Sequence, residues 1–386
     1  PGGVCCLGTL NLTRFIKADG SGFDLDKLAK YVKILVRYLD NVNTISDAPL
    51  PIYEDSMRNK RRIGAGVMGW GSALFMLKVR FGSDEANILR QQVMETYAKA
   101  AYEASIDLAI EKGKFTYCIP EEHAKGKFVQ SLGLSEDYLQ KLKTTGIRNS
   151  SLLSQQPNGN GSIFANVVTG GIEPAFMTEY IRTVIVPVTP DHMQAVTPKF
   201  FEGEFFETSM FKFAKEGDEQ ILKGVDEFGV TYKIDKNRGL TKEVLCEDYG
   251  IRYLKSQGEY NPDADYIVTT TELSVNEHIE DLKGFARWTD SACSKTCNIP
   301  NEYPYDEFKG LYLQAYNSGV IKGFTTYRAG TMTSVLSAVK ETDDVEEEII
   351  LEDIKLADSL PATLKTLRAE GRKWYLTVLL NEESTR

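Results

Sequence analysis

The alternation of strand-like and helix-like segments is the feature that most constrains how this chain can fold. Apolar residues recur every three or four positions in several segments, which predicts amphipathic helices. Shorter runs rich in β-branched or aromatic residues predict strands. The helices are expected at about 28–39, 84–108, 276–290 and 306–318, and the strands at 183–188, 266–271 and 323–327. Strands that alternate with helices are typical of an α/β fold with a largely parallel sheet or barrel.

Other stretches interrupt this alternation. Residues 151–176 are polar and rich in glycine, whereas residues 200–260 mix aromatic and charged side chains and predict helices and loops. Further on, a Glu-Gly-Arg turn at 370–372 lies between two short strand candidates, which predicts a β-hairpin. The predicted organisation is a main domain at 1–340, an acidic linker at 341–357 and a small β-rich extension at 358–386.

Composition excludes several classes of protein. The 45 Lys and Arg residues against 55 Asp and Glu residues give a net charge of −10, which argues against binding to a nucleic-acid backbone. No apolar run is long enough to form a membrane-spanning helix. The 6 cysteines are too few in 386 residues for a disulfide scaffold, so a reducing, cytoplasmic compartment is expected. A disulfide in this chain would more plausibly be transient and catalytic than structural.

One glycine-rich segment matches the dinucleotide-binding fingerprint literally. It reads G-A-G-V-M-G from Gly64 to Gly69, and Asp84 follows at about the expected distance. However, the basic residues 58–62 precede it instead of a buried strand, and there is no room for a second strand before Asp84. Asp84 is better explained as the start of a helix. We therefore favour close helix packing on small residues over nicotinamide or flavin binding.

A second glycine-rich segment, 157–162, has the sequence P-N-G-N-G-S and precedes a stretch that can continue as a helix. Converging backbone N–H groups and a helix N-terminus favour an anion, so a phosphate site is one interpretation. No lysine follows as in a Walker motif. On composition alone, an ordinary turn is the simpler account.

The cysteines allow more than one interpretation. Cys5 and Cys6 are adjacent, and neighbouring cysteines rarely bond to each other because the ring is strained. One of them could pair with a cysteine elsewhere in a redox cycle, or both could be small buried residues. Cys293 and Cys297 would share a helix face if their segment were helical, but without two further ligands we expect no metal site.

Three other residues are candidates on the basis of position. His278 lies at a strand-to-helix transition, where it could act as an acid or base, although a structural histidine is the simpler account. Tyr327 and Arg328 follow a predicted strand, which is where α/β proteins place their ligands. A structural ion pair explains Arg328 equally well.

Five blocks of sequence, taken in order, resemble the large subunit of ribonucleotide reductases. Together they cover about residues 1–335, and the tail at 358–386 is similar to the start of the extension that follows the barrel in the adenosylcobalamin-dependent class. Residues 5–12 resemble CNLGSINL, 61–69 the helix R-x-I-G-L-G-V-M-G, 148–174 the segment RN…APTGTIS…GIEP, 272–300 the segment E-I-S-P…H…SKTINLP, and 322–330 the stretch K-G-L-T-x-Y-R-D-G.

The resemblance implies the C-terminal half of a ten-stranded α/β barrel. In this family a cysteine thiyl radical removes the 3′ hydrogen of a ribonucleotide, the 2′ hydroxyl leaves as water, and two further cysteines become a disulfide. By position Cys5 is one of the reducing pair, and Cys6, which stands where the family has Asn, is the alternative. The resemblance also assigns the substrate phosphates to the loop formed by Pro157, Asn158, Gly159, Asn160, Gly161 and Ser162.

The same resemblance points to supporting residues and a radical source. Asn149, Glu173, Tyr327 and Arg328 lie in the matched blocks and are expected to support the active site. The iron-dependent class relays a radical from a small subunit through two adjacent tyrosines. Only one tyrosine occurs in 324–327, which favours adenosylcobalamin, with a small-subunit radical source as the alternative.

The family's N-P-C-G-E motif, which carries the radical cysteine, is absent from these 386 residues. We therefore expect a split gene product, an extein-like fragment or a truncated sequence that needs an N-terminal fragment of the same reductase. The other expected partners are a ribonucleotide substrate and a thioredoxin- or glutaredoxin-type reductant. The alternative is a non-catalytic remnant of the barrel that binds a nucleotide or a protein partner.

Overall fold

The computed structural model describes most of the chain. The described residues are 3–185, 206–207, 212–215, 222–225, 231–235, 239–328, 336–337, 362–369 and 372–379. The predicted acidic linker at 341–357 lies outside these ranges.

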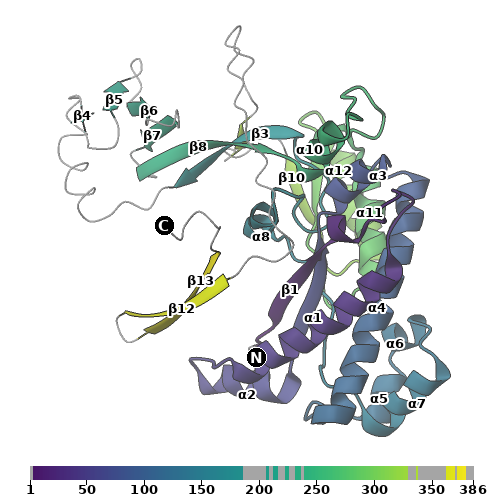
Figure 1. Cartoon of the computed structure of the whole chain (residues 1–386). Helices are drawn as coiled ribbons and strands as arrows, with labels where there is room; N and C mark the ends of the chain where they lie inside the picture. Colours follow the sequence, from purple (N-terminus) through teal and green to yellow (C-terminus); the bar gives the residue numbers. More distant parts are fainter. Residues whose placement is uncertain are drawn as a thin grey trace. The chain divides into compact units, whose positions relative to one another are not determined.

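A row of parallel strands runs beside α1 (Leu25–Ile45) and α4 (Asp84–Lys112) (Figure 1). Strand β1 (Cys6–Asn11) pairs in parallel with β2 (Ile63–Met68), and β9 (Thr296–Ile299) pairs in parallel with β10 (Thr325–Arg328). Two parallel bridges join these pairs: Ala65 with Leu153, and Gln155 with Cys293. The resulting order is β1, β2, the segment 151–155, the segment 291–299 that includes β9, and β10. In the described residues this row remains open and forms an α/β arrangement, as the sequence predicts.

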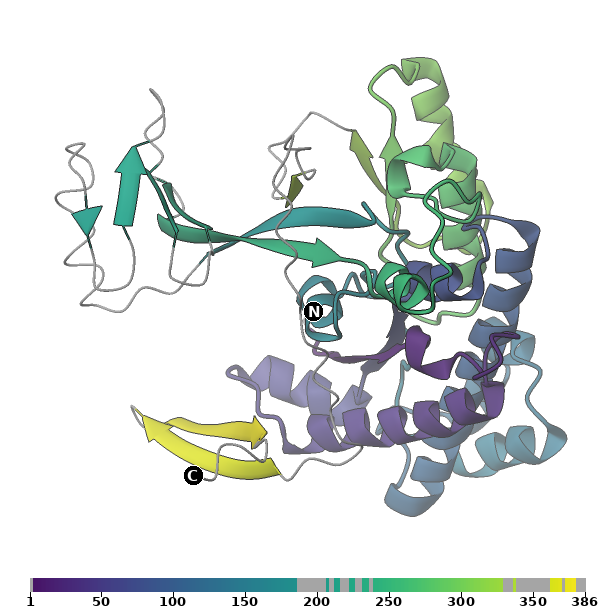
Figure 2. The same cartoon turned by 45° about the horizontal axis from the view of Figure 1, so that its top comes forward.

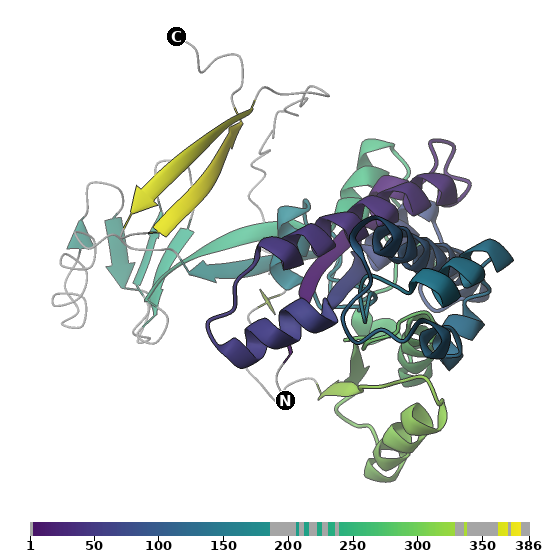
Figure 3. The same cartoon turned by 90° about the horizontal axis from the view of Figure 1, so that it is seen from below.

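The two faces of this row have different surroundings. Alternate residues of a strand point to opposite faces, and Ile63, Ala65 and Val67 of β2 are fully buried. Helices α1 and α4 cover this face, which we call the outer face (Figures 1 and 3). The opposite, inner face carries the residues in between, including Gly64 and Gly66 of β2.

Four predicted helices are confirmed. They are α1, α4, α11 (Val275–Arg287) and α12 (Tyr305–Asn317). Helix α4 begins where the sequence indicates, because the Ser83 side chain accepts a hydrogen bond from the Ala86 amide. The shorter elements are η1 (Leu12–Phe15), α2 (Pro51–Lys60), α3 (Trp70–Leu77), α5 (Pro120–Ala124), α6 (Lys127–Ser131), α7 (Glu136–Thr145), α8 (Gly159–Phe164), α10 (Tyr249–Ser256) and η3 (Thr270–Glu272).

The segment Gly64–Gly69 is not the helix that the family motif suggested. Residues 63–68 form β2, and Gly69, with a φ of 75°, is the N-cap of α3. A side chain at Gly66 would overlap the Ser154 carbonyl oxygen, and the Tyr97 hydroxyl donates to the Gly66 carbonyl at 2.7 Å. The glycines therefore allow the strand segments to approach closely. They lie within a strand and do not form the turn that a dinucleotide fingerprint requires.

The strand predicted at 266–271 is also wrong. This segment contains an isolated bridge between Thr269 and Ala175, followed by the short helix η3. The Thr270 amide and hydroxyl both donate to the Ala175 carbonyl, at 2.8 and 3.1 Å, and Thr269 forms a capping box with Glu272. These local hydrogen bonds compete with a strand ladder.

An antiparallel sheet occupies much of the region where helices and loops were predicted (Figure 2). Its strand order is β11-β3-β8-β7-β6-β5-β4. Strand β3 (Glu179–Ile185) begins earlier than the predicted strand at 183–188, of which residues 186–188 lie outside the described ranges. The other strands are β4 (Phe206–Glu207), β5 (Lys212–Lys215), β6 (Leu222–Val225), β7 (Thr231–Asp235), β8 (Gly239–Glu247) and β11 (Leu336–Ser337). The prediction for 200–260 is therefore wrong over these strands and correct only for α10, because pairing with β3 decides the structure of β8.

The C-terminal residues form a separate compact unit, which begins at Lys340. Within it, β12 (Ala362–Ala369) pairs antiparallel with β13 (Arg372–Leu379), so a hairpin lies where two strands were predicted. In the ranges that the structure describes, no helix is long and apolar enough to span a membrane.

Candidate active site

A cavity of about 820 Å³ lies at the amino-terminal ends of the strand row, where Tyr102 of α4 also lines it, and reaches the inner face at Ser154 and Gln156. It is lined by the start of β1, the residues before β2, and the segments 150–157 and 290–294. Cys5 and Pro157, which belong to two different predicted site groups, both line it. The structure therefore brings the predicted redox cysteine and the first residue of the predicted phosphate loop to one cavity.

Cys5 is an exposed free cysteine in this cavity. Partial burial of the thiol is the main cause that raises the pKa of Cys5 to about 11; the neighbouring Cys6 and Asp290 add to the shift, and the charge of Arg62 opposes it. The group is therefore a protonated thiol at neutral pH. A side chain at Gly64 would come within 3.4 Å of the Cys5 sulfur and 2.5 Å of Leu7 Cδ2, so the glycine keeps this part of the inner face open.

Cys6 lies on the other face of β1. It is partly buried and packs against the hydrophobic core under α1. Burial raises the pKa of Cys6, while a contact with Asn43 and the charge of Arg61 oppose the change. Because neighbouring residues of a strand point in opposite directions, only one of the two adjacent thiols can face the cavity. That residue is Cys5.

Asp290 is a cavity residue that the sequence reasoning missed. Its carboxylate accepts hydrogen bonds from the amides of Leu152 and Leu153, both at 2.9 Å, and from the Tyr102 hydroxyl at 2.9 Å. It thereby holds the segment 151–155 in place beside β2. The available signal was an acidic residue at the end of the predicted helix 276–290, outside the quoted motifs.

The predicted phosphate loop is the N-terminal end of α8, which lies near the ends of β1 and β2. Asn158 is the N-cap, with a left-handed φ of 54°, and makes no side-chain capping hydrogen bond in the described residues. Its Nδ2 instead donates to Thr9 Oγ1 at 2.6 Å and contacts Met68 Sδ at 2.9 Å. The Ser162 hydroxyl donates to the Gly159 carbonyl at 2.8 Å. The side chains thus hold the loop, and the first amides of α8 remain available for an anion.

Glu173 lies beside this loop in a smaller cavity of about 220 Å³, which Gly159 and Ser162 also line. Its carboxylate accepts hydrogen bonds from the Thr296 amide at 2.6 Å and from Lys295 Nζ at 3.3 Å. Burial raises the pKa of Glu173, and the charge of Lys295 opposes that change. Glu173 therefore fixes the start of β9 relative to the GIEP segment.

The Lys295 ammonium also lies 3.1 Å from Nδ1 of His278, whose Nε2 is 3.3 Å from the Thr270 carbonyl oxygen. Burial and the nearby Lys295 charge lower the pKa of His278 to about 3, so the ring is neutral. These contacts are those of a structural histidine. Glu173 from the block 148–174 and His278 and Lys295 from the block 272–300 thus form one buried network, which we call the Lys295 network.

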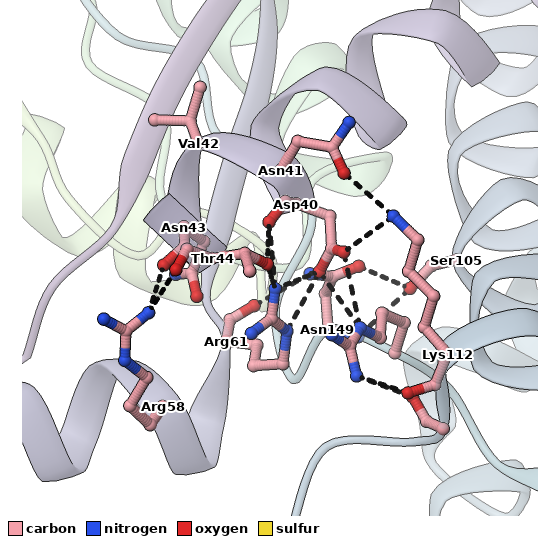
Figure 4. A network of polar contacts seen from close by, with 12 residues as sticks. Asp40, Asn41, Val42, Asn43, Thr44, Arg58, Arg61, Ser105, Lys112 and Asn149 are labelled. Carbon is pink, nitrogen blue, oxygen red and sulfur yellow. Dashed lines mark hydrogen bonds and ion pairs between the residues drawn. The ribbon is translucent and has the colours of Figure 1, made fainter. Parts of the chain in front are cut away.

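Asn149 lies in a second buried network, centred on Asp40 of α1 (Figure 4). Asn149 Nδ2 donates to Asp40 Oδ1 at 3.1 Å and to the Arg61 carbonyl at 3.0 Å, and its Oδ1 accepts from the Ser105 hydroxyl at 2.9 Å. Arg61 and Arg148 also donate to Asp40, at 2.7 Å from Arg61 Nη2 and 3.2 Å from Arg148 Nε. This Asp40 network connects α1 and α4 to two segments, the one directly before β2 and the one directly before residue 151. Its members are not among the described residues that line the Cys5 cavity.

Tyr327 and Arg328 end β10. Tyr327 is paired with Asn298 of β9, so these two residues share a face of the strand pair, whereas Thr326 shares the other face with Cys297. Arg328 donates a hydrogen bond to the Asn301 carbonyl. Neither Tyr327 nor Arg328 is among the described residues that line the two cavities.

Comparison with known proteins adds independent information. Residues 2–327 match the family model described as ribonucleotide reductase, barrel domain. The chain is 27% identical over 332 residues to a vitamin B12-dependent ribonucleoside-diphosphate reductase of Mycobacterium tuberculosis (strain ATCC 25618 / H37Rv), which covers 85% of this chain and 38% of that protein. The corresponding protein of Thermoplasma acidophilum is 27% identical over 350 residues, which are 90% of this chain and 39% of the relative.

A ribonucleoside-diphosphate reductase large subunit of Danio rerio is 31% identical over a shorter stretch of 191 residues, 47% of this chain and 24% of that protein. The chain spans about two fifths of the length of the vitamin B12-dependent relatives.

Proposed function

Because this chain belongs to the ribonucleotide reductase family through its barrel domain, we propose that it supplies part of an active site that converts ribonucleotides to deoxyribonucleotides. The observation that carries the proposal is the position of Cys5. Its thiol faces the same cavity as Pro157, the first residue of the loop that the family resemblance assigns to the substrate phosphates.

In this proposal the row of parallel strands is the C-terminal half of a ten-stranded α/β barrel. The row contains five parallel segments, from β1 to β10, with helices on the outer face. Its two edges, β1 and β10, would pair with the strands of the other half. The β12–β13 hairpin would belong to the extension that follows the barrel.

Cys5 acts in this proposal as one of the two thiols that reduce the substrate. Two thiols lose two electrons and two protons and form a disulfide, while the ribonucleotide loses its 2′ oxygen as water. A raised pKa suits this role, because the cysteine must carry its hydrogen until the reduction takes place. Cys6 is disfavoured because it packs on the core side of β1.

The loop from Pro157 to Ser162 binds the substrate phosphates in this proposal. The donors are backbone N–H groups of Gly159, Asn160 and Gly161 at the start of α8. Asn158 acts indirectly, because its side chain fastens the loop to Thr9 of β1. A loop held in this way can bind an anion without reorganisation, which lowers the cost of binding.

The remaining predicted residues have supporting roles in this proposal. Asn149 holds the strand segments next to α1 through the Asp40 network, and Glu173 holds β9 next to the phosphate loop. Arg328 orders the end of β10 through the Asn301 carbonyl. Tyr327 is the residue of β10 that could approach the reaction from the inner face.

We further propose adenosylcobalamin as the radical source. The relatives that match most of this chain are named vitamin B12-dependent, and Thr326 of β10 points away from the inner face and contacts Tyr312 of α12 at 2.9 Å. A pair of adjacent tyrosines on that strand is therefore not available to relay a radical from a small subunit.

The described histidines of this chain do not fit as cobalt ligands. Both ring nitrogens of His278 are engaged, and His123 of α5 is not among the described residues that line the Cys5 cavity or the Glu173 cavity. We therefore assign no step of the cofactor's chemistry to residues of this chain.

The proposed partners are an N-terminal region that carries the radical cysteine, a ribonucleotide, and a thioredoxin- or glutaredoxin-type reductant. The test combines this chain with a fragment that contains the N-P-C-G-E motif. Deoxyribonucleotide formation is then measured with and without adenosylcobalamin. We expect product only with both chains and the cofactor. No product under either condition, with both chains folded, would contradict the proposal.

The alternative is a non-catalytic remnant that binds a nucleotide or a protein partner. The phosphate loop is compatible with it, because its contacts do not involve Cys5. Nucleotide binding without product in the combined assay would favour this alternative.

A further inference from the structure

A second large cavity, of about 790 Å³, lies on the helical side of the molecule, between α4, α6, α11 and the loop 318–322. We call it the α4–α11 cavity. None of its lining residues lines the Cys5 cavity. Five cationic side chains and a single acidic side chain line it: Arg90, Lys127, Lys283, Arg287, Lys322 and Glu280. This concentration of positive charge contrasts with the net charge of −10 on the whole chain.

Among the described residues, carboxylates pair with two of these cations. Arg90 pairs with the buried Asp281 at 2.8 Å, and Lys283 pairs with Glu280 at 3.1 Å. Lys322 donates its three N–H groups to the backbone carbonyls of Thr289, Asp290 and Ser291, at 2.9, 2.5 and 2.7 Å. These carbonyls carry no full negative charge, so Lys322 contributes positive charge to the cavity but no free donor.

Lys127 and Arg287 are exposed, and neither forms an ion pair or a hydrogen bond within the described part of the chain. They come from α6 and α11, which are distant in sequence but border the same cavity. Together with Lys322 they leave an uncompensated charge of about three positive units at this place.

Arg90 is held in a defined position at the cavity wall. Its side chain is 9% exposed, and only Nη1 is used by Asp281 among the described residues. A side chain at Gly284 of α11 would overlap the guanidinium, so the glycine makes room for it. The guanidinium is therefore preorganised, with Nε and Nη2 free of protein partners in the described residues.

The cavity also has an apolar part. Phe128 of α6 is partly buried, packs against Tyr102 at a ring-centroid distance of 5.7 Å, and lines the cavity together with Val320 and Ala286. An aromatic ring beside cations from two elements can accept a flat organic group while the cations hold an anion.

We propose that the α4–α11 cavity binds a polyphosphate anion, a ligand with two or more linked phosphate groups. Several converging Lys and Arg side chains match a ligand with several negative charges, and guanidinium groups bind phosphate oxygens in pairs. The volume exceeds what a single small anion needs. The acidic balance of the chain argues against an extended nucleic-acid backbone.

This chemistry has two sources, a nucleotide or an inorganic polyphosphate. The test titrates the chain with ADP and, separately, with tripolyphosphate, by calorimetry at low salt. The variant is Lys127→Gln/Arg287→Gln. The matched control is Lys141→Gln/Lys309→Gln, which removes the same charge from exposed lysines outside the cavity. We expect saturable binding of at least one ligand, about tenfold or more weaker in the cavity variant and unchanged in the control.

Acetylation of lysines, measured by mass spectrometry, locates the site. Bound ligand should protect Lys127 and Lys283 and leave Lys309 reactive. This readout is independent of the proposed substrate loop, which contains no lysine. A failure of the reductase assay would therefore not count against ligand binding in the α4–α11 cavity.

Phe128→Ala distinguishes the sources. If Phe128→Ala weakens the binding of ADP but not of tripolyphosphate, the ligand is a nucleotide whose ring contacts Phe128. If the variant changes the binding of neither ligand, the phosphate chain alone determines binding. The proposal is overturned if neither ligand binds saturably, if the cavity and control variants bind equally, or if Lys127 is not protected.

Discussion

The inner and outer faces of the strand row use the same strands in opposite ways. Cys5, directly before β1, lines a cavity, and Gly64 in β2 leaves space beside it on the inner face. On the outer face, Ile63, Ala65 and Val67 of β2 are completely buried under helices. Adjacent residues of one sequence block therefore have different surroundings, with Cys5 at the cavity and Cys6 against the core. A matched motif identifies the segment, and the face of the strand identifies the role.

The sharpest test of this comparison exchanges the two adjacent thiols. Cys5→Ser should abolish multiple turnover in the combined assay described above, because the reducing pair cannot be regenerated without it. Cys6→Ser is the matched control and should retain turnover, because that side chain packs on the outer face. Deoxyribonucleotide formed per chain over many cycles measures the difference. The reverse result would assign the redox role to Cys6.

The Asp40 network should show the largest effect on stability. Asp40→Ala leaves Arg61, whose side chain is 7% exposed, without its carboxylate partner. Removing one member of a buried pair costs about 3–5 kcal/mol. The free energy of unfolding, from urea titration followed by circular dichroism, measures the loss.

Asp47→Ala is the matched control for that variant. Asp47 also pairs with an arginine, Arg58, at 3.3 Å, but its side chain is 93% exposed. Exposed pairs contribute at most about 1 kcal/mol. Equal losses in the two variants would show that the buried network is not a major support of the fold.

The sequence predicted the elements that a local pattern determines, and it missed those that depend on contacts with distant parts of the chain. Helices α11 and α12 were predicted within three residues of their observed ends because their apolar pattern is local, whereas α1 extends six residues beyond its predicted end. Strand β2 was not predicted, because nothing in the local sequence around its glycines favours a strand. They are explained only by Ser154 and Leu7, which come from distant parts of the chain. Strand β8 was missed for the same reason, since its partner β3 lies more than fifty residues earlier.

The candidate site was predicted in the same uneven way. The family resemblance selected Cys5 and the loop at Pro157, and both line the cavity. It could not separate Asn149, which lies in a buried network, from residues near the cavity, because both kinds occur in the same block. Asp290 was missed because it acts through three hydrogen bonds, and their donors are more than a hundred positions away in the sequence.

A third prediction concerns the space on the inner face. Gly66→Ala should destabilise the fold by about 1–3 kcal/mol, because the new methyl group would overlap the Ser154 carbonyl oxygen, which belongs to the backbone and cannot easily move. Thermal unfolding measures the change. The control is Gly310→Ala in α12, where no atom lies within 4 Å and alanine favours the helix. A harmless Gly66→Ala would show that the inner face has more room than its contacts indicate.

The last prediction concerns the pH dependence of stability, through the Lys295 network. The pKa of His278 is lowered to about 3 in the folded chain, from a usual value near 6.5. Between these values the unfolded chain binds the proton and the folded chain does not, so this contribution is complete above about pH 6.5 and declines as the pH falls toward 3. His278→Gln removes the titration and should flatten the acid decline of the melting temperature between pH 7 and pH 4.

Asp248 is the internal reference for that measurement. Burial raises the pKa of Asp248 to about 6, so its contribution declines as the pH rises from 4 to 6, opposite in sign to that of His278. Both proteins contain Asp248, so the difference between their pH profiles isolates the histidine. Parallel profiles would mean that His278 accepts a proton in the folded chain. The Lys295 ammonium, 3.1 Å away, would then have to move. This result would contradict the interpretation of His278 as a neutral, structural histidine.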